Sequence, residues 1–425
     1  MARVLIGLFI VLHGLVHLWY LLLSHKLVAF RPEMGWTGRS WVFTGLLGDP
    51  AARGLASIVY GLTAVVLVVA GLGVVARAGW EPPALLGSAA LSALVIVLFW
   101  DGRLERVGEK GLFGLLISLA ILGVTVGTAR YRSEMQAARE RLAGLGSQVM
   151  DTACGPIEFA QVGDGYPVLV IHGNGGGFDQ GLGLAQGYLA QGFQVIAPSR
   201  FGYLRSPLPA GATPALQADT FVCLLDALGV RQVAVLTSSA GVTSALQLAL
   251  RHPTRVSALI LHSPNAPGQV EFGLPPRPVF AALLRSDFAF WTLTTYFGAS
   301  MQALVGVPDG FALTQEEQAE VQATLASVLP VSARARGMVF DTYVSNPDIQ
   351  HYPVETIQTP TLVISAVDDP MTLHRNSRAL AEQMPKAQFL TVSDGGHMLL
   401  GHTAEVRAEI TQFLRHHVTA LEASP

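Results

Sequence analysis

Four long apolar stretches near the N-terminus dominate the pattern of hydrophobic and polar positions. They cover residues 4–24, 54–76, 82–100 and 111–129, and none of them contains an aspartate, glutamate, lysine or arginine. As helices rising about 1.5 Å per residue, they have roughly the length that crosses a hydrocarbon core of about 30 Å. The pattern predicts an all-α, four-span transmembrane domain over residues 1–130. We therefore expect a multi-pass protein of the cell membrane, with the lipid bilayer as a partner.

The ends of these stretches carry the residues typical of a membrane interface. Arg3 and Arg77 lie at the edges of the first and second stretches, and Trp100 ends the third. Charges and tryptophans are enriched where a span meets water. Pro82 and Pro83 mark the start of the third stretch, and without this span the second domain would lie on the other side of the membrane. A cleaved signal peptide is the alternative for the first stretch, but the other three would still require a membrane.

The basic residues bear on which side of the membrane the second domain lies. With four spans both termini share a side, and the basic residues of the two sides are nearly equal in number. The cluster that begins with Arg130 and Arg132 favours a cytoplasmic C-terminal domain, because basic residues concentrate in cytoplasmic segments.

Two histidines lie inside the first apolar stretch. His13 and His17 are four residues apart, so a helix places them on one face. Intramembrane ionisable residues suggest a functional site, here a metal or haem pair. Neutral imidazoles that hydrogen-bond neighbouring helices are the favoured interpretation, because the other stretches contain no second histidine or cysteine pair.

The pattern changes after residue 130. Residues 131–150 form a charged, helix-favouring segment that we interpret as an amphipathic linker, and the second domain occupies residues 151–425. Short β-rich runs then alternate with helical stretches such as 214–228 and 240–251. This alternation predicts a doubly wound, mostly parallel sheet with helices on both faces. The predicted strands are 167–171, 193–197, 233–236, 258–261, 361–364 and 388–391.

Composition supports the membrane domain and excludes some partners. Hydrophobic residues make up 51% of the chain and charged residues 13%, well below the roughly 25% charged residues of soluble proteins. A net charge of −3 leaves no excess of positive charge to attract the phosphates of nucleic acid, so we exclude nucleic acid as a partner. Cys154 and Cys223 could form at most one disulfide and belong to no metal-ligand pattern, and we expect two free thiols, no metal and no cofactor.

Polar and glycine-rich turns follow the predicted strands. Residues 172–177 read HGNGGG, without the lysine of a phosphate-binding loop, which favours a loop whose backbone N–H groups face an oxyanion. Residues 237–241 read TSSAG, where Ser239 suits a nucleophile elbow because small residues surround it. Thr237 departs from the glycine usual at its position, and an ordinary polar turn is the alternative interpretation.

Two further turns complete the predicted chemistry. Asp368 and Asp369 follow the strand at 361–364, and His397 follows the strand at 388–391. An aspartate there accepts the Nδ1 hydrogen of a histidine and leaves Nε2 free as a base. His402 is a weaker rival for the base, because it lies further from the strand end. The order serine, aspartate, histidine predicts a catalytic triad for acyl transfer.

Residues from about 155 to the C-terminus resemble the α/β-hydrolase superfamily. The resemblance is carried by the HGNGGG loop and by the APSRFGYLRSP, TSSAG, SAVDDP and GGHMLLGH segments. It implies an α/β-hydrolase fold with Ser239 as nucleophile, oxyanion donors from Asn174 and Ala240, and Asp369 rather than Asp368 as the acid. It also implies a helical cap at about residues 266–348. The membrane domain resembles no family that we can name.

The predicted function is a membrane-anchored serine esterase. A serine at the elbow argues against epoxide hydrolysis, which requires a carboxylate nucleophile there. The predicted cap is rich in aromatic residues, Phe272 and Trp291 among them, which favours a small-molecule acyl substrate of apolar or lipid-like character. Those aromatics also fit a cap that packs its own core. A non-catalytic binding or regulatory module, indicated by the unusual Thr237, is the alternative. A transporter is disfavoured because the spans lack charged residues.

Overall fold

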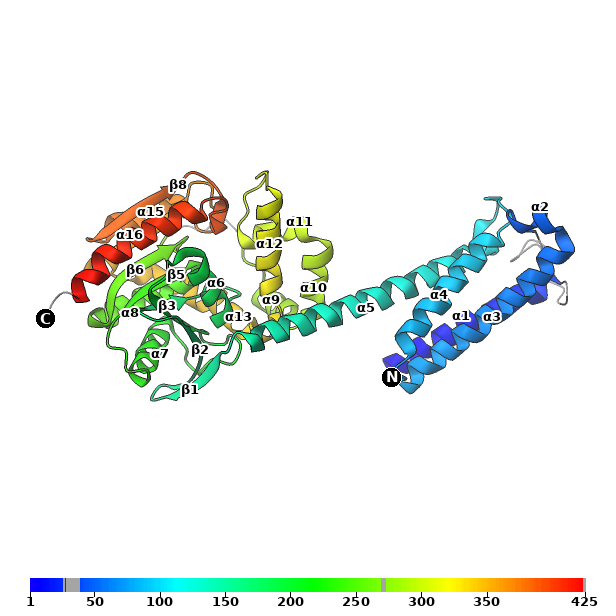
Figure 1. Ribbon diagram of the computed structural model, residues 1–425, viewed down its shortest axis with the longest axis horizontal. Coiled ribbons are helices and arrows are strands. Elements are labelled where there is room, and N and C mark those ends of the chain that lie inside the picture. Colours follow the sequence, from blue (N-terminus) through cyan, green and yellow to red (C-terminus); the bar gives the residue numbers. More distant parts are fainter. Residues whose placement is uncertain (26, 28–38, 269–272, 423–425) are drawn as a thin grey trace. The chain divides into compact units, whose positions relative to one another are not determined.

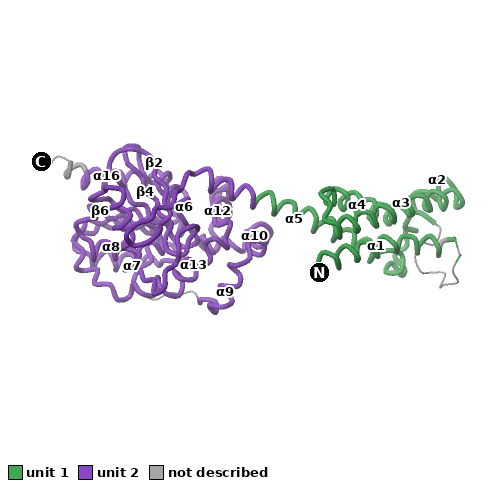
Figure 2. Tube along the Cα trace, turned by 90° about the horizontal axis from the view of Figure 1, so that it is seen from below, with its two compact units in different colours: residues 1–134 green, residues 135–425 purple. Residues whose placement is uncertain are grey.

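The computed structural model describes residues 1–425 except 26, 28–38, 269–272 and 423–425. Lys26 and Arg31, counted with the basic residues of the loops, and Phe272 of the predicted cap lie outside the described residues. The chain divides into two compact units, Met1–Glu134 and Met135–Pro425 (Figure 2). Each unit is described by itself.

The first unit is helical. Its long helices are α1 (Ala2–Ser24), α3 (Asp49–Ala76), α4 (Glu81–Leu98) and the first part of α5 (Leu112–Gly144), with a short α2 (Phe43–Leu47). All four apolar stretches predicted from the sequence form helices. Among the described residues, these four helices are long and apolar enough to cross a membrane. Pro82 and Pro83 lie in the first turn of α4, where a missing N–H is tolerated.

Glycines allow α1 and α3 to pack closely. A Cβ atom on Gly14 of α1 would lie 2.9 Å from Leu67 Cβ, and one on Gly71 of α3 would lie 2.7 Å from the Gly7 carbonyl oxygen. Small residues at such contacts are typical of helix pairs that associate in lipid. The helix α5 continues through most of the segment interpreted as a linker and ends at Gly144.

The second unit is built on one eight-stranded sheet with the order β1-β2-β4-β3-β5-β6-β7-β8. The first two strands pair in antiparallel fashion, β2 also runs antiparallel to β4, and the remaining neighbours are parallel. The strands are β1 (Gln148–Thr152), β2 (Gly155–Val162), β3 (Tyr166–Ile171), β4 (Phe193–Pro198), β5 (Val233–Ser238), β6 (Val256–His262), β7 (Thr361–Ala366) and β8 (Ala387–Val392). The predicted α/β fold is confirmed. Sequence reasoning missed β1 and β2, an edge hairpin in which β1 is mostly exposed and lacks a continuous apolar run.

Helices cover both faces of the sheet (Figure 1). On one face, α7 (Pro214–Ala227), α8 (Val242–Arg251) and α15 (His374–Gln383) pack on a core that includes Leu169 and Ile171. On the other face, α6 (Phe178–Tyr188) and α16 (Thr403–Glu422) pack on a core that includes Val168 and Val170. Alternate residues of β3 thus point to opposite faces, and both faces are buried, as parallel sheets require.

A helical segment joins β6 to β7. It contains α9 (Arg277–Leu284), α10 (Asp287–Tyr296), α11 (Gly298–Met301), α12 (Gln315–Ser327), α13 (Ala335–Phe340), a π-helical turn at Asp341–Ser345 and α14 (Asn346–Asp348). We call this segment the cap. Its own small core contains Val307, Val321 and Leu325, together with Leu400 from beyond β8.

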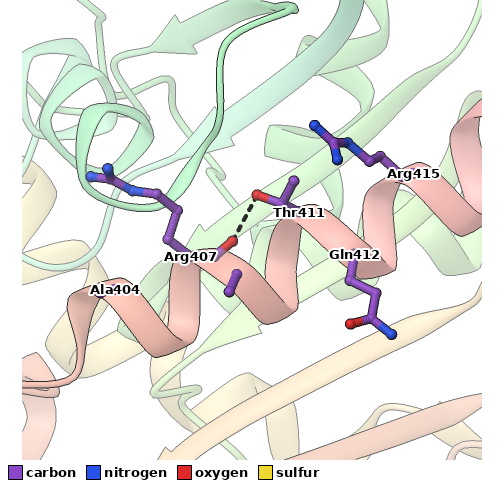
Figure 3. Close-up of a pocket in the computed structure, with 6 residues that line it drawn as sticks. Ala404, Arg407, Thr411, Gln412 and Arg415 are labelled. Atoms are coloured by element: carbon purple, nitrogen blue, oxygen red, sulfur yellow. Dashed lines mark hydrogen bonds between the residues drawn. The ribbon is translucent and has the colours of Figure 1, made fainter.

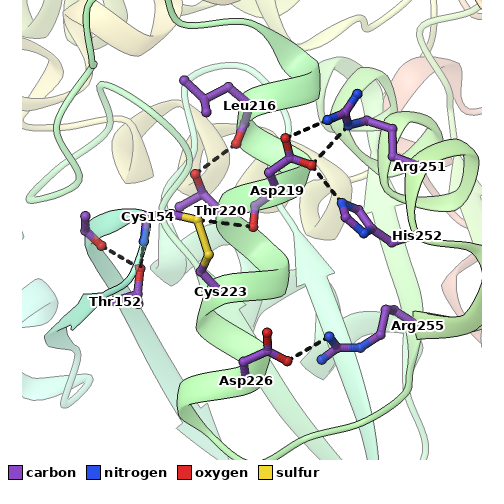
Figure 4. The surroundings of a disulfide bond; sticks show 11 residues. Thr152, Cys154, Leu216, Asp219, Thr220, Cys223, Asp226, Arg251, His252 and Arg255 are labelled. Carbon is purple, nitrogen blue, oxygen red and sulfur yellow. Dashed lines mark hydrogen bonds and ion pairs between the residues drawn. A yellow bond between two sulfur atoms is a disulfide. The ribbon is translucent and has the colours of Figure 1, made fainter.

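The two cysteines form a disulfide bond, so the prediction of free thiols was wrong (Figure 4). Cys154 lies in the turn between β1 and β2, Cys223 lies in α7, and their Cα atoms are 6.0 Å apart. The cysteines are 69 residues apart in sequence. Their proximity depends on the β1–β2 hairpin, which sequence reasoning did not find.

Candidate active site

Ser239 lies at a sharp turn between β5 and α8. Its φ angle is +51°, in the left-handed region that non-glycine residues rarely adopt. A Cβ atom on Gly241 would lie 2.6 Å from the His172 carbonyl oxygen, so only glycine allows the turn to approach β3 this closely. Thr237 is fully buried, and its Oγ1 has no hydrogen-bond partner among the described residues. The strained turn presents a partly exposed serine beyond the carboxyl end of a parallel strand.

Asp369 and His397 are in direct contact. The distance from His397 Nδ1 to Asp369 Oδ2 is 2.9 Å, although the residues come from separate turns after β7 and β8. Burial alone would raise the pKa of Asp369, but the charge and hydrogen bond of His397 outweigh it and lower that pKa below its ordinary value. Thr372, which sequence reasoning missed, donates its hydroxyl to Asp369 Oδ2 at 2.7 Å. The aspartate is therefore a buried, ionised partner for the histidine.

The two rival residues take other roles. Asp368 Oδ1 accepts a hydrogen bond from the backbone N–H of Gly396 at 2.9 Å, which holds the turn that carries His397. His402 contacts Asp394, with 2.7 Å between His402 Nε2 and Asp394 Oδ1, and its side chain contacts Glu405 as well.

A buried histidine at the end of β6 was not singled out from the sequence. His262 Nδ1 lies 3.2 Å from Ser238 Oγ, and its ring centroid lies 4.7 Å from that of Tyr188. Burial, reinforced by the charge of His397 and opposed by Asp369, lowers the pKa of His262 to about 3. The imidazole is therefore neutral near pH 7 and adds no positive charge beside His397.

The glycine-rich loop lies against the serine. A Cβ atom on Gly173 would be 3.2 Å from Ser239 Cβ, which brings this loop beside the elbow. Asn174, the next residue, is exposed, and Ala240 is buried directly after Ser239. His172 holds the base of the loop: its Nδ1 donates to the Gly173 carbonyl at 2.7 Å, and its Nε2 accepts from the Arg200 N–H at 3.0 Å.

A buried ion pair supports this loop from the cap. Arg200 donates to Asp341 of the π-helical turn, with 2.7 Å between Arg200 Nη1 and Asp341 Oδ1, and to the Gly173 carbonyl at 3.1 Å. Tyr203 donates its hydroxyl to Asp341 and lies 3.0 Å from Asn174 Oδ1. The network ties the cap to the loop. Sequence reasoning did not identify these residues, although Arg200 and Tyr203 belong to a segment that carried the family resemblance.

The cap also contacts the histidine turn. The backbone N–H of His397 donates to the Gly306 carbonyl at 2.9 Å. Gly306 has a φ of +74°, and a Cβ atom there would collide with His397 Cβ. Only glycine fits at this contact.

Other surface features lie apart from these residues. A hollow on the surface of α16 is lined by Ala404, Arg407, Ala408, Thr411, Gln412 and Arg415 (Figure 3). Arg407 already donates to the backbone carbonyls of Gly187 and Gln186. In the described ranges, no group of three or more His, Cys, Asp or Glu side chains is placed to hold a metal ion.

Known proteins resemble the second unit. The family model for the alpha/beta hydrolase fold matches residues 166–401. A 2-hydroxymuconate semialdehyde hydrolase from Pseudomonas putida is 31% identical over 261 residues, which cover 59% of this chain and 87% of that protein. A putative carbamate hydrolase RutD from Stutzerimonas stutzeri is 28% identical over 239 residues, covering 51% and 84%.

Among solved structures, an alpha/beta hydrolase fold protein from Nakamurella multipartita matches with a TM-score of 0.51 and 29% identity, covering 64% of this chain and 99% of that one. The family model begins at residue 166, beyond the apolar helices. Since that model spans more than half of the chain and the relatives align over most of their own length, this protein belongs to the α/β-hydrolase fold family and is a hydrolase.

Proposed function

We propose that Ser239, His397 and Asp369 form a catalytic triad that cleaves an ester-like acyl substrate through an acyl-enzyme. The observation that carries the proposal is the 2.9 Å contact between His397 Nδ1 and Asp369 Oδ2. Because an ionised carboxylate can only accept, Nδ1 carries the hydrogen and Nε2 is left free as a base.

The reaction proceeds in two halves. His397 Nε2 takes the hydroxyl proton of Ser239 while Oγ bonds to the acyl carbon, and the same proton then passes to the leaving alcohol. A water molecule next gives a proton to His397 and attacks the acyl carbon, and the same proton passes from His397 to Ser239 Oγ as the bond between Oγ and the acyl carbon breaks and the acid is released. The backbone N–H groups of Ala240 and Asn174 hold the oxyanion in both halves. Support for these donors comes from the position of the loop beside Ser239.

The proposed substrate is a small molecule with an apolar acyl group. The relatives bear names for different reactions, a semialdehyde hydrolase and a putative carbamate hydrolase. These names support hydrolysis but do not identify the kind of bond that this protein cleaves. The aromatic composition of the cap is the support for an apolar acyl group.

Covalent labelling tests the proposal. We expect a fluorophosphonate probe to label the full-length protein, and Ser239→Ala to abolish the labelling. Ser238→Ala is the matched control, because Ser238 is the neighbouring, equally half-buried serine. If folded protein stays unlabelled, the chain is instead a non-catalytic, hydrolase-like module that binds a ligand, which the buried, unpaired Thr237 hydroxyl favours.

We also propose that residues 1–130 form a four-span membrane domain, joined through residues 131–150 to a catalytic domain over residues 151–425 with its cap at about 266–348. The support is the length and apolar character of α1, α3, α4 and α5. Resistance to extraction with alkaline carbonate is the expected result. Release into the supernatant would refute membrane insertion.

The disulfide bond indicates on which side of the membrane the hydrolase domain lies. The arginines after the fourth apolar stretch favour the cytoplasm, whereas a disulfide between Cys154 and Cys223 favours an oxidising compartment, because cytosolic thiols are kept reduced. We give the disulfide more weight, since the count of basic residues is nearly balanced, and propose an extracytoplasmic hydrolase domain. A C-terminal alkaline phosphatase fusion is expected to be active. An inactive fusion, with both cysteines reacting with maleimide in unreduced cells, would place the domain in the cytoplasm.

A further inference from the structure

The cap presents apolar side chains to solvent on two consecutive helices. On α9, Val279 is 60% exposed and Leu283 is 37% exposed, and their spacing of four residues places them on one helix face. On and after α10, Phe288, Tyr296 and Phe297 are 51%, 56% and 57% exposed. Leu274, just before α9, is 48% exposed. These six residues are called the apolar cap face.

Two of the exposed aromatic rings, Phe288 and Tyr296, pack against the same tryptophan. The Phe288 ring centroid lies 5.9 Å from that of Trp291, and the Trp291 centroid lies 5.7 Å from that of Tyr296. Trp291 itself is buried, so the exposed rings rest on a fixed base. Apolar surface displayed in this way marks an interaction site, because its exposure to water is unfavourable.

The charges around the face are basic. Between residues 273 and 304 the charged residues are Arg277, Arg285 and Asp287. Both arginines are exposed, whereas Asp287 accepts hydrogen bonds from the backbone N–H and the hydroxyl of Ser332, each at 2.8 Å. Exposed apolar and aromatic side chains flanked by arginines suit a lipid surface with anionic headgroups.

The chain itself limits how far the cap can lie from a membrane. Arg141, near the end of α5, donates to the backbone carbonyls of Ser327 and Leu329, at 3.0 and 3.4 Å, where α12 ends. The last apolar stretch ends at Ala129, within the same helix. Twelve residues of chain reach at most about 43 Å even when fully extended, so the chain tethers the cap to the membrane in which that stretch is inserted. This tether makes the bilayer the nearest available partner.

We propose that the apolar cap face docks on the same bilayer that holds the four apolar helices, so that an apolar substrate reaches the active site from the membrane. The inference rests on the proposed membrane insertion. Its occupant is the lipid surface, and a second copy of the chain is a rival that the test distinguishes.

Depth-dependent fluorescence quenching tests the docking. Val279→Cys in the full-length protein is labelled with an environment-sensitive maleimide dye, after reconstitution in vesicles of phosphatidylcholine and phosphatidylglycerol. The native cysteines are held in their disulfide, so only the new thiol reacts. Glu382→Cys, on the exposed side of α15, is the matched control on the body of the domain, and Val65→Cys, 59% exposed on α3, reports insertion of the apolar helices.

We expect lipids that carry a doxyl group near the headgroup to quench the dye at position 279, and lipids that carry it deep in the acyl chain to quench the dye at position 65. Aqueous iodide should quench the dye at position 382. If iodide alone quenches the dye at position 279 while doxyl lipids quench the dye at position 65, the proposed docking of the cap is wrong and the proposed membrane insertion stands. Protection of 279 from both quenchers would show that protein covers the face. If 65 is also accessible to iodide, the membrane insertion fails first.

Enzyme kinetics give a second measurement. The double variant Val279→Gln, Leu283→Gln is expected to lower kcat/KM about fivefold for a long-chain ester held in the vesicles, and to leave a short, water-soluble ester unaffected. Equal loss on both esters would indicate damage to the cap instead. If the parent protein hydrolyses neither ester, the proposed esterase activity fails, while the quenching still decides the docking.

Discussion

Replacing Asp369 with asparagine should disable the base without disturbing the turn around it. The Asp369 carboxylate accepts four hydrogen bonds. Its Oδ1 accepts from the backbone N–H groups of Met371 and Thr372, at 2.8 and 2.9 Å. Its Oδ2 accepts from the Thr372 hydroxyl at 2.7 Å and faces His397 Nδ1 at 2.9 Å.

The backbone donors determine how an asparagine would sit. Two N–H groups require an oxygen at the Oδ1 position, so the amide NH2 must take the Oδ2 position and face His397. The NH2 then donates to Nδ1, which moves the imidazole proton to Nε2. In that tautomer His397 cannot accept the proton of Ser239. The structure therefore implies a wrong tautomer rather than a lost fold.

The expected loss is about ten-thousand-fold in kcat for Asp369→Asn, the effect known for this tautomer switch in serine proteases. At about 1.36 kcal/mol per tenfold, it corresponds to about 5.5 kcal/mol of transition-state stabilisation. Steady-state hydrolysis of a p-nitrophenyl ester by the purified full-length protein measures it. Asp368→Asn keeps an oxygen for the Gly396 N–H and should cost less than about tenfold. The reasoning is refuted if Asp368→Asn is the more damaging change, or if Asp369→Asn keeps a tenth of the activity.

The remaining predictions concern buried polar groups. Asp341→Ala leaves Arg200 buried without its partner and should destabilise the second unit by about 3 to 5 kcal/mol, which thermal unfolding of the variant against the parent would show. The pKa of His262 is lowered to about 3, so the folded state binds fewer protons than the unfolded state and stability falls as pH drops below about 6.5. The His262 part of this loss should reach about 3 kcal/mol by about pH 4.5, so His262→Phe should lose about that much less than the parent, as pH-dependent melting curves would show. The loss that remains in the variant comes from other buried groups such as His172, whose pKa burial also lowers. Ser92→Ala removes a hydroxyl 2.9 Å from His17 Nε2 and should destabilise the first unit by about 0.6 to 2 kcal/mol in detergent unfolding.

The sequence predicted features that local pattern determines. The four apolar helices follow from runs without charge, and six strands of the second unit follow from short β-rich runs. The turn residues were found because each follows a strand directly. The hydrogen bond between Asp369 and His397 joins two of those turns, and it required only that parallel neighbouring strands end at one edge of the sheet.

Features formed by residues distant in sequence could not be predicted. Arg200 and Asp341 are 141 residues apart, and the cap segment around Asp341 has no pattern that indicates a buried carboxylate. The disulfide joins residues 69 apart through a hairpin with little apolar periodicity. In the first unit, His13 and His17 were placed on one face, but their contacts with Ser118 and Ser92 depend on the packing of three helices. That hydrogen bonding agrees with the interpretation of neutral imidazoles.

The cap contacts two parts of the proposed catalytic machinery at once. Gly306 accepts a hydrogen bond from the backbone of His397, and Asp341 holds Arg200, which in turn bonds the loop at Gly173. A shift of the cap would therefore move the base and the oxyanion donors together. Since transition-state stabilisation depends on both positions, substitutions that disturb these two contacts, such as Asp341→Ala, should lower kcat as well as raise KM, unlike substitutions on the exposed apolar cap face. A cap that only bound the acyl chain would change KM alone, because binding shared equally by substrate and transition state leaves kcat unchanged.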